Sequence, residues 1–140
     1  MAGYSGTPLA RKLGIAEGER LAMLGAPDGF AIPDLPAGVE VRTQACGPFG
    51  VIVSFHTDRA DLASRLPALM KALAVNGGLW IAWPKKASGL ATDITEDTVR
   101  DVALPTGLVD NKVCAIDDTW SGLRLVLRKE LRPGRTTAAG

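Results

Sequence analysis

The stretch Asn76-Gly77-Gly78-Leu79-Trp80-Ile81-Ala82-Trp83-Pro84-Lys85-Lys86 joins a glycine turn, an apolar strand and two lysines without a spacer. A continuous apolar run is typical of a strand that is covered on both faces of a sheet. Pro84 ends this strand, because proline has no N–H for the sheet's hydrogen-bond ladder. Lys85 and Lys86 therefore follow the strand's carboxyl end, the edge where open α/β sheets bind their ligands. The stretch predicts an α/β sheet with a candidate binding site at that edge.

Size and composition indicate an ordinary globular protein. We expect the 140 residues to form one Rossmann-like domain over residues 1–131, followed by a disordered tail at 132–140 that has no apolar face. With 16 basic and 15 acidic side chains the net charge is +1, so no overall field attracts a membrane or nucleic acid. No apolar run approaches the roughly 20 residues that span a bilayer, and residues 1–6 lack the basic-then-apolar layout of a secretion signal, so we expect a cytoplasmic protein. Cys46 and Cys114 lie far apart without a neighbouring histidine, which predicts neither a disulfide nor a metal site.

The remaining strands follow from hydrophobic patterning. Residues 39–43 alternate apolar with polar side chains, which is typical of a strand near a sheet edge, whereas the β-branched run 51–55 belongs at the centre. The last two strands are joined by only residues 117–122, too few for a crossover helix, so they form an antiparallel hairpin on an otherwise parallel sheet. We expect about six strands in a three-layer α/β fold, over residues 21–26, 39–43, 51–55, 79–83, 112–116 and 123–128.

Three helices are expected between these strands. Thr7 is the expected N-cap of a short helix that ends at Gly14 and covers one end of the sheet. Thr57 or Asp58 precedes a longer helix, in which leucines recur every three or four residues up to residue 73. Either Asp93 or Thr95 caps the third helix, and acidic residues in its first turn favour the positive end of the helix dipole.

This order of elements resembles the class I methyltransferase version of the Rossmann-like fold over residues 13–130. Residues 13–21 resemble the lead-in to that family's first strand, and residues 73–81 resemble its fifth. The resemblance implies a seven-stranded sheet, here without one strand and its helix, and S-adenosylmethionine as cofactor. That family holds the cofactor with a glycine-rich turn after the first strand and an acidic residue after the second. Here those places read Gly25-Ala26-Pro27-Asp28-Gly29 and Arg42-Thr43-Gln44, so the cofactor would have to bind in an altered way.

The chain as a whole also resembles an uncharacterised family of small bacterial proteins, a domain of unknown function. The matching segments are Gly3-Tyr4-Ser5-Gly6-Thr7-Pro8-Leu9, Trp83-Pro84-Lys85-Lys86 and Asp117-Asp118-Thr119-Trp120-Ser121-Gly122-Leu123. This resemblance implies no activity.

The candidate site lies where the turns 25–29, 56–58 and 83–86 are expected to meet, at the carboxyl edge of the parallel strands. Lys85 and Lys86, next to a helix that starts near Thr95, would suit a phosphate or carboxylate, although they are also compatible with a solvated loop. His56 is the only histidine and would have to carry any histidine-dependent catalysis, unless it is simply a polar residue at a strand end. Candidate ligand-binding residues are Gly25, Pro27, His56, Trp83, Lys85, Lys86 and Thr95.

Three functions are compatible with this pattern. The leading hypothesis is a module that binds a small anionic ligand or a protein partner at the sheet edge without catalysis. The alternatives are an S-adenosylmethionine-dependent methyltransferase with an altered cofactor turn, and a pure protein-interaction domain. The basic residues near the C-terminus are not interleaved with aromatic residues, so nucleic-acid binding is not expected.

Overall fold

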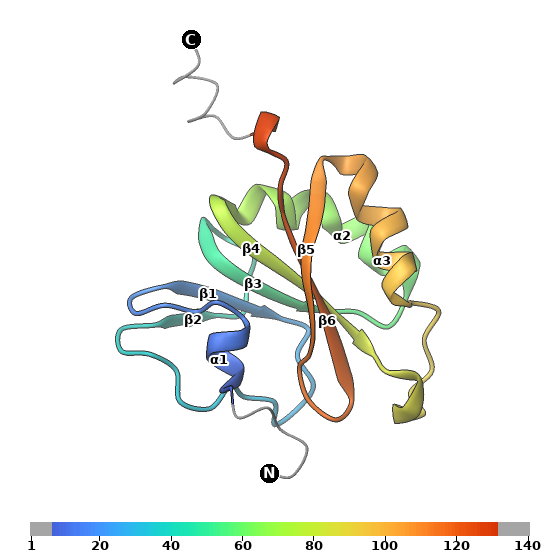
Figure 1. The fold of residues 1–140 in the computed structure, drawn as a ribbon, viewed down its shortest axis with the longest axis horizontal. Coiled ribbons are helices and arrows are strands. Elements are labelled where there is room, and N and C mark those ends of the chain that lie inside the picture. The colour runs from blue at the N-terminus through green and yellow to red at the C-terminus, as the bar shows by residue number, and fades with distance from the viewer. Residues whose placement is uncertain (1–6, 132–140) are drawn as a thin grey trace.

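The computed structural model describes residues 7–131 and forms one six-stranded sheet in the order β2-β1-β3-β4-β6-β5 (Figure 1). Strands β1 to β4 run parallel, whereas β6 is antiparallel to both β4 and β5. The mixed α/β sheet and its C-terminal hairpin are therefore confirmed, as are β2 at the edge and β3 near the centre. The strands are β1 Arg20–Leu24, β2 Glu40–Arg42, β3 Phe49–Phe55, β4 Leu73–Pro84, β5 Leu108–Ala115 and β6 Trp120–Leu127.

The glycine pair Gly77-Gly78 lies inside β4, so the expected glycine turn before this strand is wrong. Helix α2 (Arg59–Ala72) passes directly into β4 at Leu73. A Cβ on Gly77 would lie 2.9 Å from the carbonyl oxygen of Phe49, and a Cβ on Gly78 would collide with the Arg124 guanidinium. The two glycines thus allow close contacts within the sheet rather than a change of chain direction.

Helices α2 and α3 (Glu96–Ala103) cover one face of the sheet (Figure 1). The leucine stripe of α2 is buried as expected, with Leu62, Leu66 and Leu69 each at most 2 % exposed. They pack with Val99 of α3 against the strand side chains that point to this side. Burial of this stripe on the sheet explains why the helix forms, because helices in proteins are stabilised mainly by packing of an apolar face.

The short helix α1 (Leu9–Lys12) lies on the opposite face, together with the segment between β1 and β2. The Trp80 indole N–H donates a hydrogen bond of 3.0 Å to the carbonyl oxygen of Leu13, and both residues are buried. The expectation that this helix covers the end of the sheet is therefore wrong. Its N-cap residue is Pro8 rather than Thr7, and the cap has no side-chain hydrogen bond.

The start of α3 is capped by one of the two expected residues, whereas the start of α2 is not capped as expected. Thr95 caps α3 in a reciprocal arrangement with Thr98, which confirms one of the two expected residues. Asp93 instead accepts a 2.7 Å hydrogen bond from the backbone N–H of Arg59, the first residue of α2. Asp58 precedes that helix without a side-chain cap. A residue 34 positions away therefore fastens the start of α2.

Residues 1–6 and 132–140 lie outside the described part of the chain, and with them the expected tail and most of the first family segment. Among the described helices, none has the length and apolar composition needed to cross a membrane.

Candidate functional site

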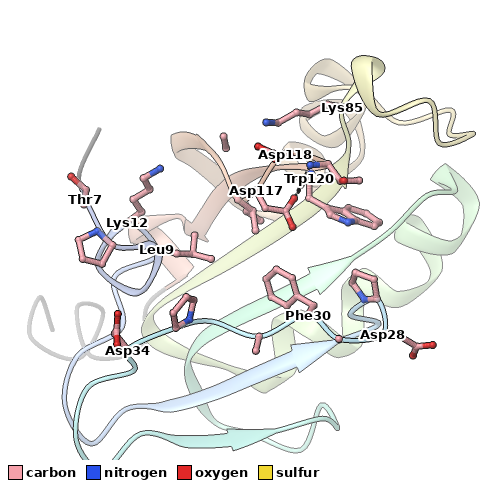
Figure 2. Close-up of a pocket in the computed structure, with 18 of the residues that line it drawn as sticks. Thr7, Leu9, Lys12, Asp28, Phe30, Asp34, Lys85, Asp117, Asp118 and Trp120 are labelled. Atoms are coloured by element: carbon pink, nitrogen blue, oxygen red, sulfur yellow. Dashed lines mark hydrogen bonds between the residues drawn. The ribbon is translucent and has the colours of Figure 1, made fainter. Parts of the chain in front are cut away.

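A large cavity, which we call the α1 cleft, lies between α1, residues 27–34 and the turn between β5 and β6 (Figure 2). Its volume is about 1040 Å³, enough for a molecule of metabolite size. The turns after β1 and β4 both reach it, through Pro27 and Lys85. It therefore lies along the carboxyl edge of parallel strands, where α/β sheets bind ligands.

Among residues 7–131, two amines and four carboxylates line the α1 cleft. Lys12 comes from α1 and Lys85 from the turn after β4, and Figure 2 shows them extending from different walls of the opening. Lys85 is half-buried, and its backbone N–H donates a 2.8 Å hydrogen bond to the carbonyl oxygen of Thr119, which fixes the turn that carries it. The carboxylates are those of Asp28, Asp34, Asp117 and Asp118.

Aromatic side chains form an apolar wall of the same cleft. The Phe55 ring stands edge-to-face between the rings of Phe30 and Trp120, with centroid distances of 5.0 and 5.1 Å. Phe30 and Trp120 line the cavity. One carboxylate oxygen of Asp117 accepts 2.8 Å hydrogen bonds from the backbone N–H groups of Thr119 and Trp120. The Asp117 turn thus caps itself and holds Trp120 at the wall.

A second cavity of about 330 Å³, the α2 pocket, lies on the other side of the turn that follows β1. Its lining includes Gly25, Gln44 after β2, Ser54 of β3 and Arg65 of α2. Gly25 has φ = +69°, and a Cβ there would lie 3.1 Å from the carbonyl oxygen of Phe55. Both the backbone conformation and the close approach favour glycine at this turn.

His56 is 3 % exposed and forms a hydrogen-bonded row with two residues that sequence analysis did not select. Its Nε2 lies 2.7 Å from Ser54 Oγ, and its Nδ1 lies 2.8 Å from Asp61 Oδ2. The other carboxylate oxygen of Asp61 accepts a 2.9 Å hydrogen bond from Arg65 Nε.

Burial lowers the pKa of His56 below its usual 6.5, although the Asp61 carboxylate opposes that effect. The imidazole is therefore neutral at pH 7, with Nδ1–H donating to Asp61 and Nε2 accepting the Ser54 hydroxyl proton. Hydrogen bonds from His56 and then from Arg65 lower the pKa of Asp61, which keeps the carboxylate ionised.

The predicted site residues are divided among several locations. Pro27 and Lys85 line the α1 cleft, Gly25 lines the α2 pocket, and His56 lies in the buried row next to that pocket.

Lys86, Thr95 and Trp83 line neither cavity. Lys86 is exposed at the start of the short 3-10 helix Lys86–Ser88, and Thr95 is exposed as the cap of α3. Trp83 is 6 % exposed and packs in the core beneath the helices, because strand alternation turns it to the same face as Ile81.

Ser54 and Asp61 were not selected from the sequence, although local patterns could have pointed to both. Ser54 precedes His56 by two positions, so both side chains point to the same face of an extended chain. Asp61 lies in the first turn of the following helix, close enough to reach back to the strand end. No comparable signal marked Lys12 or Trp120, since their approach to Lys85 depends on how α1 and the hairpin pack.

Solved structures with a similar fold include several methyltransferases. A SAM-dependent methyltransferase from Aquifex aeolicus aligns with a TM-score of 0.61 at 13 % identity, covering 84 % of this chain and 86 % of the other. Magnesium protoporphyrin IX methyltransferase from Synechocystis PCC 6803, solved with bound SAM, also gives 0.61 at 13 % identity, covering 86 % and 74 %. Ribosomal protein L11 methylase from Lactobacillus delbrueckii subsp. bulgaricus gives 0.56 at 11 % identity, covering 86 % and 75 %. At these identities the likeness shows the methyltransferase-like fold alone.

The sequence matches none of the curated proteins with which it was compared. Residues 48–129 match the model of a family described as "Protein of unknown function (DUF3052)". Because this match covers more than half of the 140 residues, the chain belongs to that family.

Proposed function

We propose that the protein is a binding module that takes a small anionic ligand in the α1 cleft. The observation that carries this proposal is the presence of Lys12 and Lys85 on the lining of one cleft that also has an aromatic wall. Amines bind phosphate or carboxylate groups as point charges, and an aromatic wall accepts the flat face of a ring. A ligand with an anionic group and an adjoining ring would use both features.

The four carboxylates of the α1 cleft narrow the class of ligand. A bare phosphate would be repelled by Asp28, Asp34 and the Asp117-Asp118 pair at the same time as it is attracted by the lysines. Hydroxyl or amino groups on the ligand would instead donate hydrogen bonds to those carboxylates. We therefore expect a hydroxylated or aminated molecule with one anionic end, such as a nucleotide or a sugar phosphate, to bind better than inorganic phosphate.

The test compares the ligand-induced rise in Tm between variants of two adjacent lysines, Lys85 and Lys86. Thermal unfolding of the wild-type protein is followed with nucleotides, sugar phosphates, inorganic phosphate and S-adenosylmethionine at concentrations up to the millimolar range. A ligand of the native state raises the Tm by mass action. Lys85→Ala should abolish that rise, whereas Lys86→Ala, which lies outside the cleft, should keep it.

Without ligand, the free energy of unfolding of both variants should lie within about 1 kcal/mol of wild type, because Lys86 is exposed, Lys85 is only half-buried, and charges that contact water contribute little to stability. Absence of a Tm rise with every compound would contradict the small-ligand proposal and leave a protein-interaction domain. An equal loss in both variants would show that the effect does not come from the α1 cleft.

A second candidate is a methyltransferase that uses S-adenosylmethionine in an altered mode. The observations in its favour are the sheet order, the fold neighbours and the glycine with positive φ after β1. Pro27, in the same turn, has no N–H to offer a cofactor, and Thr43 and Gln44 stand where an acidic residue would hold a ribose. A Tm rise with S-adenosylmethionine and S-adenosylhomocysteine, but not with the other compounds, would favour this candidate.

A further inference from the structure

Ser54, His56 and Asp61 form a row with the connectivity of a serine nucleophile, its general base and the carboxylate that orients the base. Ser54 Oγ lies 2.7 Å from His56 Nε2, and Asp61 Oδ2 lies 2.8 Å from His56 Nδ1. In serine hydrolases the same order of atoms lets the imidazole take the hydroxyl proton while the carboxylate stabilises the imidazolium. The row lies on the α2 side of the sheet, so it is separate from the α1 cleft.

The row is held by rigid elements. Ser54 belongs to β3, His56 follows it directly, and Asp61 lies in the first turn of α2, whose start is tied down by Asp93. Arg65 Nε donates a hydrogen bond to Oδ1 of Asp61, which leaves Oδ2 to accept from the imidazole. Such support keeps a catalytic base in its productive tautomer and orientation.

The row ends at the α2 pocket, because Ser54 is one of the residues that line it. Leu24, Ala68 and Leu69 provide apolar lining, and Arg65 adds a positive charge. With a volume of about 330 Å³ and Ser54 only 2 % exposed, the pocket admits a small group rather than a long chain. A short acyl group, bound as an ester, fits this combination of size and lining.

We propose that Ser54 is the nucleophile of an esterase site that cleaves small acyl esters in the α2 pocket. Ser54 Oγ bonds to the ester carbonyl carbon as its proton passes to His56 Nε2. The bond to the leaving oxygen then breaks, and His56 returns the proton to that oxygen, which departs as an alcohol. Water, deprotonated by the same Nε2, attacks the acyl-Ser54 ester, releases the carboxylic acid and restores the serine hydroxyl.

Covalent labelling of the full chain tests the proposal directly. A small dialkyl fluorophosphate loses fluoride when an activated serine attacks it, and intact-mass analysis with peptide mapping locates the adduct. We expect one adduct on Ser54 in the native protein, none in the protein unfolded in urea, and none at any position in Ser54→Ala. Ser64→Ala is the matched control, since Ser64 is an exposed serine of α2 outside the row, and it should label as wild type does.

His56→Gln separates catalysis from structure. If the imidazole is the base, labelling and p-nitrophenyl acetate hydrolysis should slow by about 10²–10⁴-fold in this variant, measured where circular dichroism shows that it is folded. Absence of a Ser54 adduct in the native wild-type protein would overturn the proposal. An adduct that forms at the same rate in folded His56→Gln would also overturn it, because the serine would then not depend on the row.

Discussion

Trp80→Phe tests how α1 is held on the sheet, and thereby how one wall of the α1 cleft is built. The substitution removes the indole N–H that donates to the Leu13 carbonyl at 3.0 Å, in a site where both residues are at most 1 % exposed. Leaving that carbonyl unsatisfied costs about 1–3 kcal/mol. The lost ring volume of roughly 40 Å³, at about 24 cal/mol per Å³, adds about 1 kcal/mol. We therefore expect the free energy of unfolding to fall by about 2–4 kcal/mol.

Trp83→Phe is the matched control, because it removes the same atoms from the core on the other face. Within residues 7–131 the Trp83 indole N–H has no hydrogen-bond partner, so only the packing cost of about 1 kcal/mol is expected. Urea unfolding is followed by circular dichroism at 222 nm, since each variant alters the fluorescence. If Trp80→Phe proves no more costly than Trp83→Phe, the Trp80–Leu13 hydrogen bond does not stabilise the fold and α1 must be held otherwise.

Two further predictions concern polar contacts of α2. Because burial lowers the pKa of His56 from 6.5, the unfolded chain binds more protons than the folded chain as the pH drops below that value. The wild-type free energy of unfolding should therefore decline as the pH falls below about 6.5, by no more than about 1.4 kcal/mol per pH unit. The decline should be shallower in His56→Gln, and equal slopes in urea titrations of the two proteins would contradict this. Asp93→Ala should cost about 0.5–2 kcal/mol by removing the cap of α2, whereas Asp93→Asn keeps an acceptor and should cost less. Equal losses in these two variants would argue against capping.

The sheet was predictable because its signals are local. Apolar runs, proline and short connections depend on neighbouring residues, and they correctly gave six strands and a terminal hairpin. Where the expectation failed, the cause was a contact from elsewhere in the chain. The Gly77-Gly78 pair has the composition of a turn, but its role is set by Phe49 and Arg124 on neighbouring strands. Likewise Asp93 has the right spacing to cap α3, yet it lies where it can reach the backbone of Arg59.

The candidate site was less predictable than the fold, as the example of the two adjacent lysines shows. Sequence treats Lys85 and Lys86 as one cationic pair. In the structure the backbone of Lys85 is extended and hydrogen-bonded to Thr119 in the β5–β6 turn, whereas Lys86 starts a short 3-10 helix and is not one of the residues that line the cleft. Which of two neighbours lines a cavity depends on the hairpin that packs beside them, and no local pattern encodes that packing.

Successive residues at the end of β3 face two separate cavities, one on each side of the sheet. Successive residues of a strand point to opposite faces, so Phe55 joins the aromatic wall of the α1 cleft while Ser54 and His56 face α2. Gly25 packs against the Phe55 carbonyl, between the two sets of side chains. A side chain at position 25 would therefore strain the positive-φ turn and displace Phe55 together with the start of the His56 row. If such a variant lost both ligand binding and ester hydrolysis, the result would not separate the two proposals. Lys85→Ala and Ser54→Ala do separate them, because each changes the lining of only one cavity.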